Sequence, residues 1–451
     1  MRTAVEMARA VRDRSVSPVE LVEEALRRAE SWQPVTRAFS QLHADEALEQ
    51  ARLRTEEVTR GELPPLHGVP VAVKDLFDVA GWETTGCCAA YRGRMAERDA
   101  EVVRRLRMAG AVVIGKTNQH ELAAGATNLI SACGATANPW DPTRITGGSS
   151  GGSGAAVAAG VVPVALGTDT GGSIRIPASM CGVTGLKPTH GVVSLDGVMP
   201  LAPSLDSVGP LATTVEDAAV VQAVLSGEPP TDLDGMDGLE VATLGSLHVA
   251  FLHPEVLGAV LAAAERFEGL GATISSVVGD GCFAPEVWAE VAWREMAEHH
   301  GALLDRPELL HRPTVELLRR GAEQAEEVTA AARERAGAVR AAFLAALSTA
   351  DVLLAAATPI VAPPAGADWV EVRSGRLSVR RGAPSLLTRS VNLAGLPAVS
   401  VPAGFSSDGL PIGIQLIGRP GEEAAILRAA AAFQAVTDHH VAVPERPEGS
   451  G

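Results

Sequence analysis

Residues 147–175 read GGSSGGSGAAVAAGVVPVALGTDTGGSIR, and this stretch decides the fold. Two glycine-rich turns enclose a small, apolar run from 151 to 160 and the segment VVPVALGTD. Small residues let a helix pack tightly against a sheet, and an apolar run between turn signals is typical of a buried strand. We therefore predict a helix and a core strand, with Ser149 and Ser173 in the turns at their ends.

The same alternation continues on both sides of this stretch. VPVAV before Lys74 predicts a buried strand, residues 99–109 a helix, and AVVIGK another strand. Towards the C-terminus, VATL, ATISSVV, DVLLAAATPIVAPP, PAVSVPAG and PIGIQLIG predict further strands, and residues 254–270 and 422–436 predict helices. The pattern indicates an α/β fold with a central mixed, mostly parallel sheet and helices on both faces.

The expected boundaries follow from these periods. Residues 3–60 are predicted to be helical, with a capping box at Ser17 and Glu20, and two long amphipathic helices are expected over 285–304 and 313–347. We expect one domain over 1–451, divided into an N-terminal helical segment (1–62), a core with the candidate catalytic residues (63–230), a C-terminal part that completes the sheet and pocket (231–440), and a frayed tail (441–451).

Composition excludes several function classes. The formal net charge is −16, and no basic run offers a phosphate-binding face, so we expect no direct binding of nucleic acid. The apolar runs are too short for a bilayer, and the charged N-terminus does not resemble a secretory signal, which predicts a cytoplasmic protein without a membrane association. The five cysteines lack metal-ligand spacing and are expected to be reduced thiols, with Cys87 and Cys88 simply packed.

The glycine-rich turns do not match the known phosphate cradles. A P-loop requires a lysine directly after its closing glycine, and this chain has neither that lysine nor a GxGxxG fingerprint. The GTDTGG turn can instead direct backbone N–H groups at an oxyanion beside the hydroxyl of Ser173. A serine, however, needs a neighbouring base before it becomes a good nucleophile.

Lys74 is the candidate base. Of the 38 cationic residues only Lys74, Lys116 and Lys187 are lysine, and a buried lysine can lose its proton whereas arginine cannot. Asp75 would oppose that loss if its side chain pointed the same way. No histidine stands in a Gly-x-Ser-x-Gly arrangement, although His120 and His190 flank the region and stay open as alternatives.

The motifs together resemble the amidase signature family. The likeness runs from about residue 15 to 436, through GVPVAVKD, GKTN, NPWDPTRITGGSSGGSGAAVAAG, GTDTGGSIRIPASMCGVTGLKPTHG, SLDSVGPLATTVEDAA, NLAGLPAVSVPAGF and GLPIGIQLIG. The resemblance implies a Ser-cisSer-Lys triad in which Ser173 forms the acyl-enzyme, Ser149 follows a cis peptide bond and relays the proton, and Lys74 is the base. It also implies an oxyanion hole at the backbone of Thr170, Gly171, Gly172 and Ser173, and no metal or cofactor.

The neighbouring residues receive supporting roles. Ser150 and Ser153 are expected to make loop hydrogen bonds. Thr168 and Asp169 are expected to lie behind the triad, and Arg175 to pair with a carboxylate inside the motif. Lys116 and Lys187 look structural in their family contexts, and registration on the matched motifs places Ala123 in the pocket lining.

The implied activity is hydrolysis of a carboxamide C–N bond. Aromatic residues make up 3% of the chain, which disfavours a pocket built on aromatic stacking and favours a small or polar acyl group. Two alternatives stay open: the A subunit of a tRNA-dependent amidotransferase, which would act as a glutaminase with a partner, and an amide-forming acyltransferase. We expect a homodimer or an assembly with a small accessory subunit.

Overall fold

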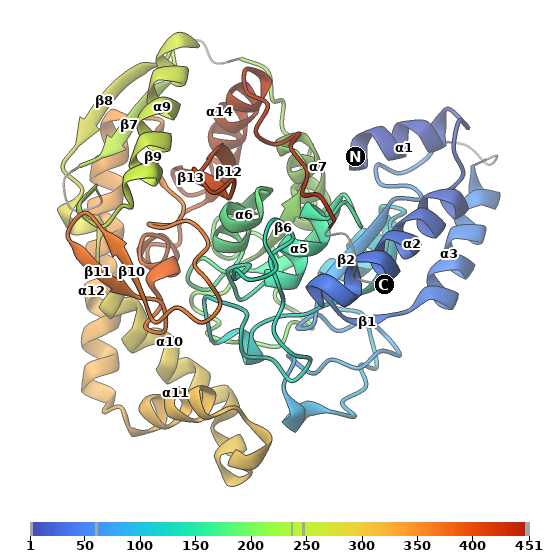
Figure 1. The fold of residues 1–451 in the computed structure, drawn as a ribbon, viewed down its shortest axis with the longest axis horizontal. Helices are drawn as coiled ribbons and strands as arrows, with labels where there is room; N and C mark the ends of the chain where they lie inside the picture. The colour runs from blue at the N-terminus through green and yellow to red at the C-terminus, as the bar shows by residue number, and fades with distance from the viewer. Residues whose placement is uncertain (1–2, 59–61, 236–237, 246–248, 447–451) are drawn as a thin grey trace.

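A single mixed sheet of 11 strands organises the chain in the computed structural model, which describes residues 3–58, 62–235, 238–245 and 249–446 (Figure 1). The strand order is β1-β3-β2-β4-β6-β5-β12-β13-β9-β7-β8. The strands are β1 (Phe39–Leu42), β2 (Pro70–Lys74), β3 (Val112–Thr117), β4 (Val164–Thr168), β5 (Thr184–Lys187), β6 (Val208–Ala212), β7 (Glu240–Leu244), β8 (Thr273–Val277), β9 (Val352–Ala356), β12 (Ala398–Phe405) and β13 (Pro411–Ile417). A separate hairpin pairs β10 (Trp369–Val372) with β11 (Gly375–Ser378).

Helices cover both faces of this sheet. They are α1 (Ala4–Arg12), α2 (Pro18–Thr36), α3 (Ala44–Glu57), α4 (Glu101–Met108), α5 (Gly151–Ala158), α6 (Arg175–Cys181), α7 (Val215–Ser226), α9 (Pro254–Gly269), α10 (Pro285–His300), α11 (Arg312–Glu323), α12 (Glu326–Ala346), α13 (Arg389–Leu393) and α14 (Glu423–Ala435). In β2, Val71 and Val73 pack into the cluster that includes α4 and α7, whereas Ala72 packs into the cluster that includes α2 and α5. Alternate side chains of a strand point to opposite faces, so β2 is buried from both sides.

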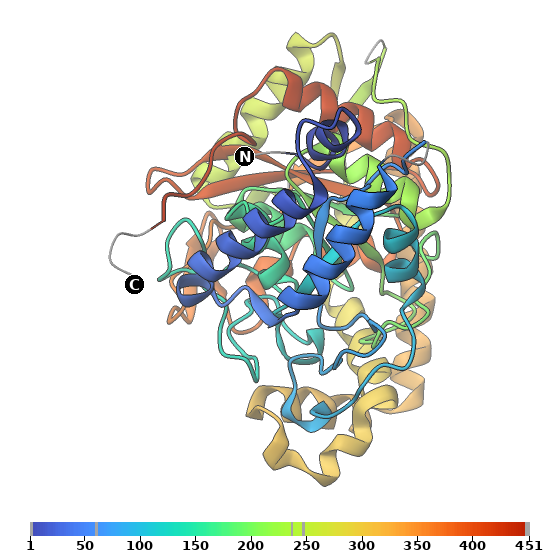
Figure 2. The same cartoon turned by 90° about the vertical axis from the view of Figure 1, so that its right-hand side faces the viewer.

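The turned view shows α2 and α3 lying across one side of the molecule, and α11 lies near the bottom of the same view (Figure 2).

The capping box predicted at Ser17 is present: its hydroxyl accepts from the Glu20 N–H, while the Glu20 carboxylate accepts from the Ser17 N–H. The helix and strand predicted from residues 147–175 are α5 and β4. Within the described residues, no helix combines the length and the apolar character needed to cross a membrane.

The α/β class and the mixed sheet are confirmed, but the sheet is not mostly parallel. Of the described pairings in the large sheet, β2 with β3 and β4, and β7 with β8 and β9, are parallel, and the other six are antiparallel. The parallel strands form two blocks joined by an antiparallel centre. A connection as short as 406–410, between β12 and β13, cannot hold the crossover that a parallel pair requires.

Two predicted helical segments are interrupted. The 3–60 segment contains β1, which pairs antiparallel with β3 from far along the chain, and such a partner is invisible to local periodicity. The helix expected over 313–347 divides at Gln324, whose backbone is extended (φ −69°, ψ 127°). Its side chain donates to the Glu290 carbonyl of α10 at 2.7 Å and to the Thr329 hydroxyl of α12 at 2.8 Å, and these two bonds hold the break. Of the tail predicted over 441–451, residues 447–451 lie outside the described part.

The first turn of α5 packs against backbone, which fixes the position of the preceding serine loop. A Cβ on Gly152 would lie 2.3 Å from the Asn118 carbonyl oxygen and 2.4 Å from that of Ala38. Neither carbonyl belongs to a flexible side chain, so a methyl group has no free space. This glycine lets the end of β3, the end of α2 and the start of α5 meet.

Replacing Gly152 with alanine is therefore expected to lower the free energy of unfolding by about 3 kcal/mol, because the added methyl overpacks the junction. Gly258→Ala is the matched control: it also lies in a helix, and a Cβ there meets nothing within 4 Å. That control should raise stability by about 0.5–1 kcal/mol. Denaturant midpoints of the two variants measure the contrast, and equal effects would contradict this account of α5 packing.

Candidate active site

Lys74 ends β2 and lies fully buried beside the end of β4. Its Nζ donates to the Ser149 hydroxyl at 2.7 Å and to the Thr168 hydroxyl at 2.8 Å. Because β2 and β4 are parallel neighbours, their carboxyl ends meet at the same edge of the sheet, where sites of α/β proteins usually form. The structure thus brings Lys74, Ser149 and Thr168 together from three separated segments.

Burial changes the protonation of this amine. Desolvation lowers the pKa of Lys74 to about 7, although the charges of Asp206 and Asp169 act in the opposite direction. Asp75, which could have opposed the shift, instead pairs with Lys116 at 2.9 Å and accepts from the Thr85 hydroxyl. A substantial share of Lys74 is therefore a neutral amine near pH 7, and Lys116 has the structural role expected of it.

The loop before α5 presents Ser149. The Gly148–Ser149 peptide bond is cis, as the family resemblance implied. Ser150 donates from its hydroxyl to the Thr168 carbonyl at 3.2 Å, and Ser153 donates to the Leu166 carbonyl at 2.9 Å. These two serines fasten the loop and α5 to β4, which agrees with the expected loop hydrogen bonds.

Asp169 organises the turn that carries Ser173. Its carboxylate accepts from the N–H groups of Gly172 at 2.8 Å and Ile174 at 3.1 Å. Arg175 forms a buried ion pair with it at 3.0 Å, as predicted, and Asn392 of α13 donates to it at 2.8 Å. The Asp169 carboxylate therefore stabilises the turn by accepting hydrogen bonds from backbone N–H groups and from the side chains of Arg175 and Asn392.

This arrangement corrects one expected oxyanion donor. The Gly172 N–H is already bonded to Asp169, so it does not point at a ligand. In the described part of the chain, the N–H groups of Thr170, Gly171 and Ser173 donate to no acceptor, and all three residues line the cavity. Gly172 has φ of +120° and a Cβ there would lie 2.1 Å from the Thr388 hydroxyl, so this glycine shapes the turn.

Ser173 lies beside the serine loop without a direct side-chain bond to it. The Ser150 N–H donates to the Ser173 carbonyl at 3.2 Å, which aligns the two turns. Among the described residues, no hydrogen bond joins the hydroxyls of Ser149 and Ser173. The geometry therefore contains the Lys74–Ser149 contact of the expected relay but not a Ser149–Ser173 hydrogen bond. Catalytic hydrogen bonds of this kind often form only when substrate is bound.

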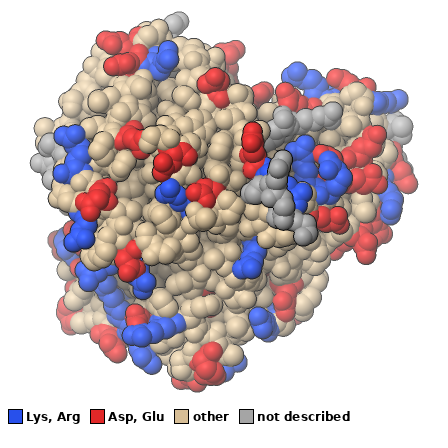
Figure 3. Space-filling view, viewed as in Figure 1, with Lys and Arg blue, Asp and Glu red and all other residues tan. Residues whose placement is uncertain are grey.

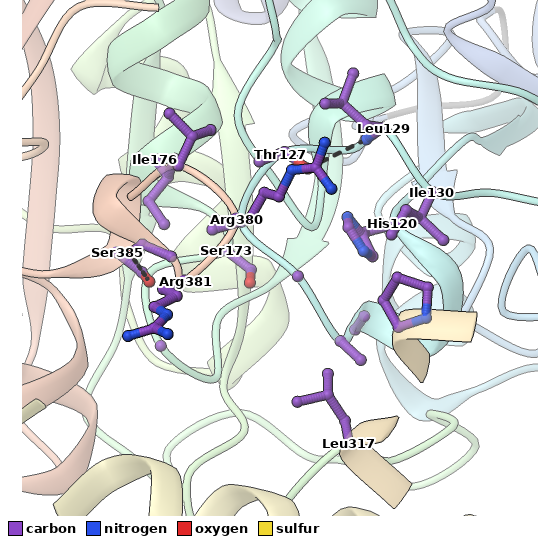
Figure 4. A pocket seen from close by; sticks show the side chains of 18 of the residues that line it. His120, Thr127, Leu129, Ile130, Ser173, Ile176, Leu317, Arg380, Arg381 and Ser385 are labelled. Atoms are coloured by element: carbon purple, nitrogen blue, oxygen red, sulfur yellow. Dashed lines mark hydrogen bonds between the residues drawn. The ribbon is translucent and has the colours of Figure 1, made fainter. Parts of the chain in front are cut away.

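A cavity of about 860 Å³ opens over Ser173. In the close view, the Ser173 hydroxyl faces a hollow that is bordered by His120, Thr127, Arg380, Arg381 and Ser385 (Figure 4). Ala123 is part of the lining, as expected, but Trp288 and Trp293 line it too. The low aromatic content disfavoured a pocket built on aromatic stacking, but it does not prevent two tryptophans of α10 from lining this cavity.

The two histidines left open differ in position. His120 lines the cavity, and burial lowers its pKa to about 3, so its ring is neutral at ordinary pH. Its Nδ1 is buried without a hydrogen-bond partner. His190 instead has its Nδ1 3.0 Å from the Asp206 carbonyl and is not among the cavity-lining residues.

Two residues that contact Thr170, in the turn before Ser173, were not predicted from the sequence. Asp206 accepts from the Thr170 hydroxyl at 2.5 Å and from the Leu201 and Ala202 N–H groups. Burial raises the pKa of this carboxyl. Trp288 donates from Nε1 to the Thr170 carbonyl at 2.7 Å. The sequence placed Trp288 only on the apolar face of a predicted helix. That pattern does not distinguish a residue of the hydrophobic core from one that lines a pocket.

Charge is unevenly distributed on the face seen in Figure 3. Acidic and basic side chains are interspersed over much of it, and basic side chains gather at its lower left, in the region where Figure 1 draws β10, β11 and α11.

In the described ranges, no three His, Cys, Asp or Glu side chains lie close enough together to hold a metal ion.

Comparison with known proteins gives consistent matches over the chain. The family model described as amidase matches residues 20–427. The chain is similar to the A subunit of the glutamyl-tRNA(Gln) amidotransferase of Chloroflexus aurantiacus, with 37% identity over 98% of this chain and 97% of that protein. It is also similar to a solved amidase structure, with 37% identity, a TM-score of 0.91 and coverage of 96% and 99%. The solved structure of the A subunit from Thermotoga maritima matches with 30% identity, a TM-score of 0.80 and 95% coverage of each chain.

Removing the Arg175 guanidinium should be far more damaging than removing a surface arginine. Arg175→Met leaves the Asp169 carboxylate buried without its ion-pair partner and is expected to cost about 3–5 kcal/mol of unfolding free energy. Arg312→Met removes an arginine whose side chain is 90% exposed in its pair with Glu316, and should cost less than about 1 kcal/mol. Denaturant titrations compare the two, and similar losses would contradict the organising role of Asp169.

Proposed function

The chain belongs to the amidase family, and from that premise we propose that it hydrolyses a carboxamide C–N bond through an acyl-enzyme on Ser173. One observation carries the proposal: a buried amine with a pKa lowered to about 7 donates to the Ser149 hydroxyl at 2.7 Å. The cavity above Ser173 gives an amide access to the nucleophile.

In the proposed reaction, neutral Lys74 accepts the proton of the Ser149 hydroxyl while Ser149 accepts that of Ser173. The Ser173 oxygen then attacks the amide carbonyl carbon, and the N–H groups of Thr170, Gly171 and Ser173 stabilise the oxyanion. The proton held by the Lys74–Ser149 pair passes to the amide nitrogen as the C–N bond breaks. Water repeats the attack on the acyl-enzyme and releases the acid.

The second candidate is the glutaminase component of a tRNA-dependent amidotransferase. It is favoured by the 37% identity to the A subunit of the Chloroflexus aurantiacus enzyme over nearly the whole of both chains. Against it, the match to the solved amidase is closer in backbone than the match to the solved A subunit of Thermotoga maritima, with TM-scores of 0.91 and 0.80. We therefore propose a free-standing amidase first.

Turnover of a panel of small and polar carboxamides by the isolated chain is the direct test. Ser173→Ala should lower kcat by roughly 10⁴-fold or more, because the acyl acceptor is lost while the cavity and backbone donors persist. Mass spectrometry of quenched wild-type reactions should detect the acyl group on Ser173. Ser374→Ala, at an exposed site in the β10–β11 turn, is the control and should leave kcat unchanged. Turnover that requires both tRNA and a partner protein would favour the amidotransferase instead.

The pH dependence tests the base. Because the charged form of Lys74 must lose its proton before it can act, kcat/KM should rise about tenfold per pH unit below 7 and level off above it, with a midpoint of about 7. Lys74→Arg should be as inactive as Lys74→Ala, since arginine keeps its proton.

Deprotonation of Lys187 could produce the same pH dependence of kcat/KM, because burial also lowers the pKa of Lys187 to about 7. Its Nζ donates to the Pro188 carbonyl at 2.7 Å, away from Ser149. Lys187→Gln should therefore keep the midpoint where the wild type has it. A profile that is flat between pH 5 and 9, or an active Lys74→Arg enzyme, contradicts the role of a neutral Lys74.

A further inference from the structure

Arg389 is a half-buried cation that the proposed reaction does not use. It begins α13 and lines the cavity over Ser173. Its Nε is buried without a hydrogen-bond partner, and among the described residues no carboxylate pairs with its guanidinium. Burial lowers its pKa to about 10, and no acidic group offsets that shift. The side chain therefore stays charged at neutral pH and lacks a counterion.

Its position relative to the reacting groups is fixed by two contacts. The guanidinium lies over the Trp288 ring, 4.7 Å from its centroid, and Trp288 Nε1 donates to the Thr170 carbonyl at 2.7 Å. The preceding residue, Thr388, donates from its hydroxyl to the Gly171 carbonyl at 2.6 Å. Both contacts reach the turn that carries Ser173. Arg389 is thus a fixed part of the wall beside the nucleophile.

The rest of the lining does not neutralise this charge. Of the described residues, two acidic ones line the cavity: Asp368 pairs with Arg380, and Glu316 pairs with Arg312, which lies outside the lining. In the described part of the chain, Arg320 and Arg381 line the cavity without a carboxylate partner. A protein whose net charge is −16 therefore has a cavity lined by an excess of cations, which attracts anionic ligands.

We propose that Arg389 binds a carboxylate of the substrate, so that the preferred amides are those that carry a carboxylate in addition to the scissile carboxamide. This inference rests on the proposed amidase function. A guanidinium fork matches the two oxygens of one carboxylate. A half-buried arginine whose Nε is removed from water without a partner gains from an anion that completes its hydrogen bonds. A neutral amide leaves that charge unpaired in the wall.

A packing role on Trp288 is the competing account of Arg389. Under that account, its loss would affect all substrates alike. The carboxylate proposal instead predicts a loss that depends on substrate charge. Matched substrates separate the two, because succinamate and succinamide differ mainly in whether the far end is a carboxylate or a carboxamide.

The experiment measures kcat and KM of the full chain for succinamate and glutaramate, and for the neutral diamides succinamide and glutaramide. The wild type should favour the carboxylates by at least about tenfold in kcat/KM. Arg389→Met should lose about 100-fold on the carboxylates, mainly through KM, and less than about threefold on the diamides. Arg389→Lys, which keeps the charge without the fork, should be intermediate. A wild type that uses the diamides equally well, or an equal loss on both substrate kinds, overturns the proposal.

Arg376→Met is the matched control. Arg376 also lies over a tryptophan ring, 5.7 Å from the centroid of Trp369, but it is outside the cavity lining. Its kinetic constants should match those of the wild type for all four substrates. Thermal melts establish that each variant is folded. If Arg389→Met is unstable, Arg389→Lys carries the test, and it should lose activity on the carboxylates but not on the diamides.

Calorimetric binding of succinate keeps this inference separate from the proposed function. Succinate should bind the wild type and Ser173→Ala alike, and at least about tenfold more weakly to Arg389→Met. If no amide is hydrolysed but this pattern holds, the amidase function fails while the anion site stands. If amides are hydrolysed but succinate binds Arg389→Met as tightly as wild type, the anion site fails while the amidase function stands.

Discussion

The burial of one amine, Lys74 at the end of β2, is the constraint on which the site depends. A cation that is fully removed from water costs free energy, and the protein limits that cost by letting the pKa fall to about 7 and by satisfying Nζ with two hydroxyls, those of Ser149 and Thr168. Those hydroxyls come from the loop before α5 and from the end of β4. The parallel β2–β4 pair therefore fixes all three groups at one edge of the sheet.

The second constraint joins the two halves of the chain. Asp169 holds the turn that carries Ser173, and its carboxylate is shared between Arg175 of α6 and Asn392 of α13. From the same C-terminal segment, Thr388 reaches the Gly171 carbonyl and Arg389 covers Trp288. The nucleophile turn and the proposed carboxylate subsite thus share supports, so a substrate that pairs with Arg389 would contact a wall already fixed relative to Ser173.

Much of this was predictable from local pattern. The segments around Lys74, Ser149 and Ser173 have strong turn and strand signals, and Arg175 could be paired with a carboxylate of its own motif. The predictions that were wrong share one physical cause: the contacts that determine these structures join residues that lie far apart in the sequence. β1 forms only because β3 offers an edge, Gln324 breaks a helix because of contacts to α10, and the antiparallel centre of the sheet depends on strands that enter from both halves. The donor role of Gly172 failed because the direction of an N–H cannot be read from residue type.

The sequence by itself determined the family, the α/β class, the segments that form the site and the residue types able to perform amide chemistry, because glycine turns, apolar periods and motif spacing are local properties. Only the tertiary structure decided which groups meet. Asp75 faces Lys116, the amine of Lys74 is removed from water, and Trp288 and Arg389 line the cavity beside Ser173. Desolvation and side-chain direction arise from packing between distant segments, and no local pattern encodes them.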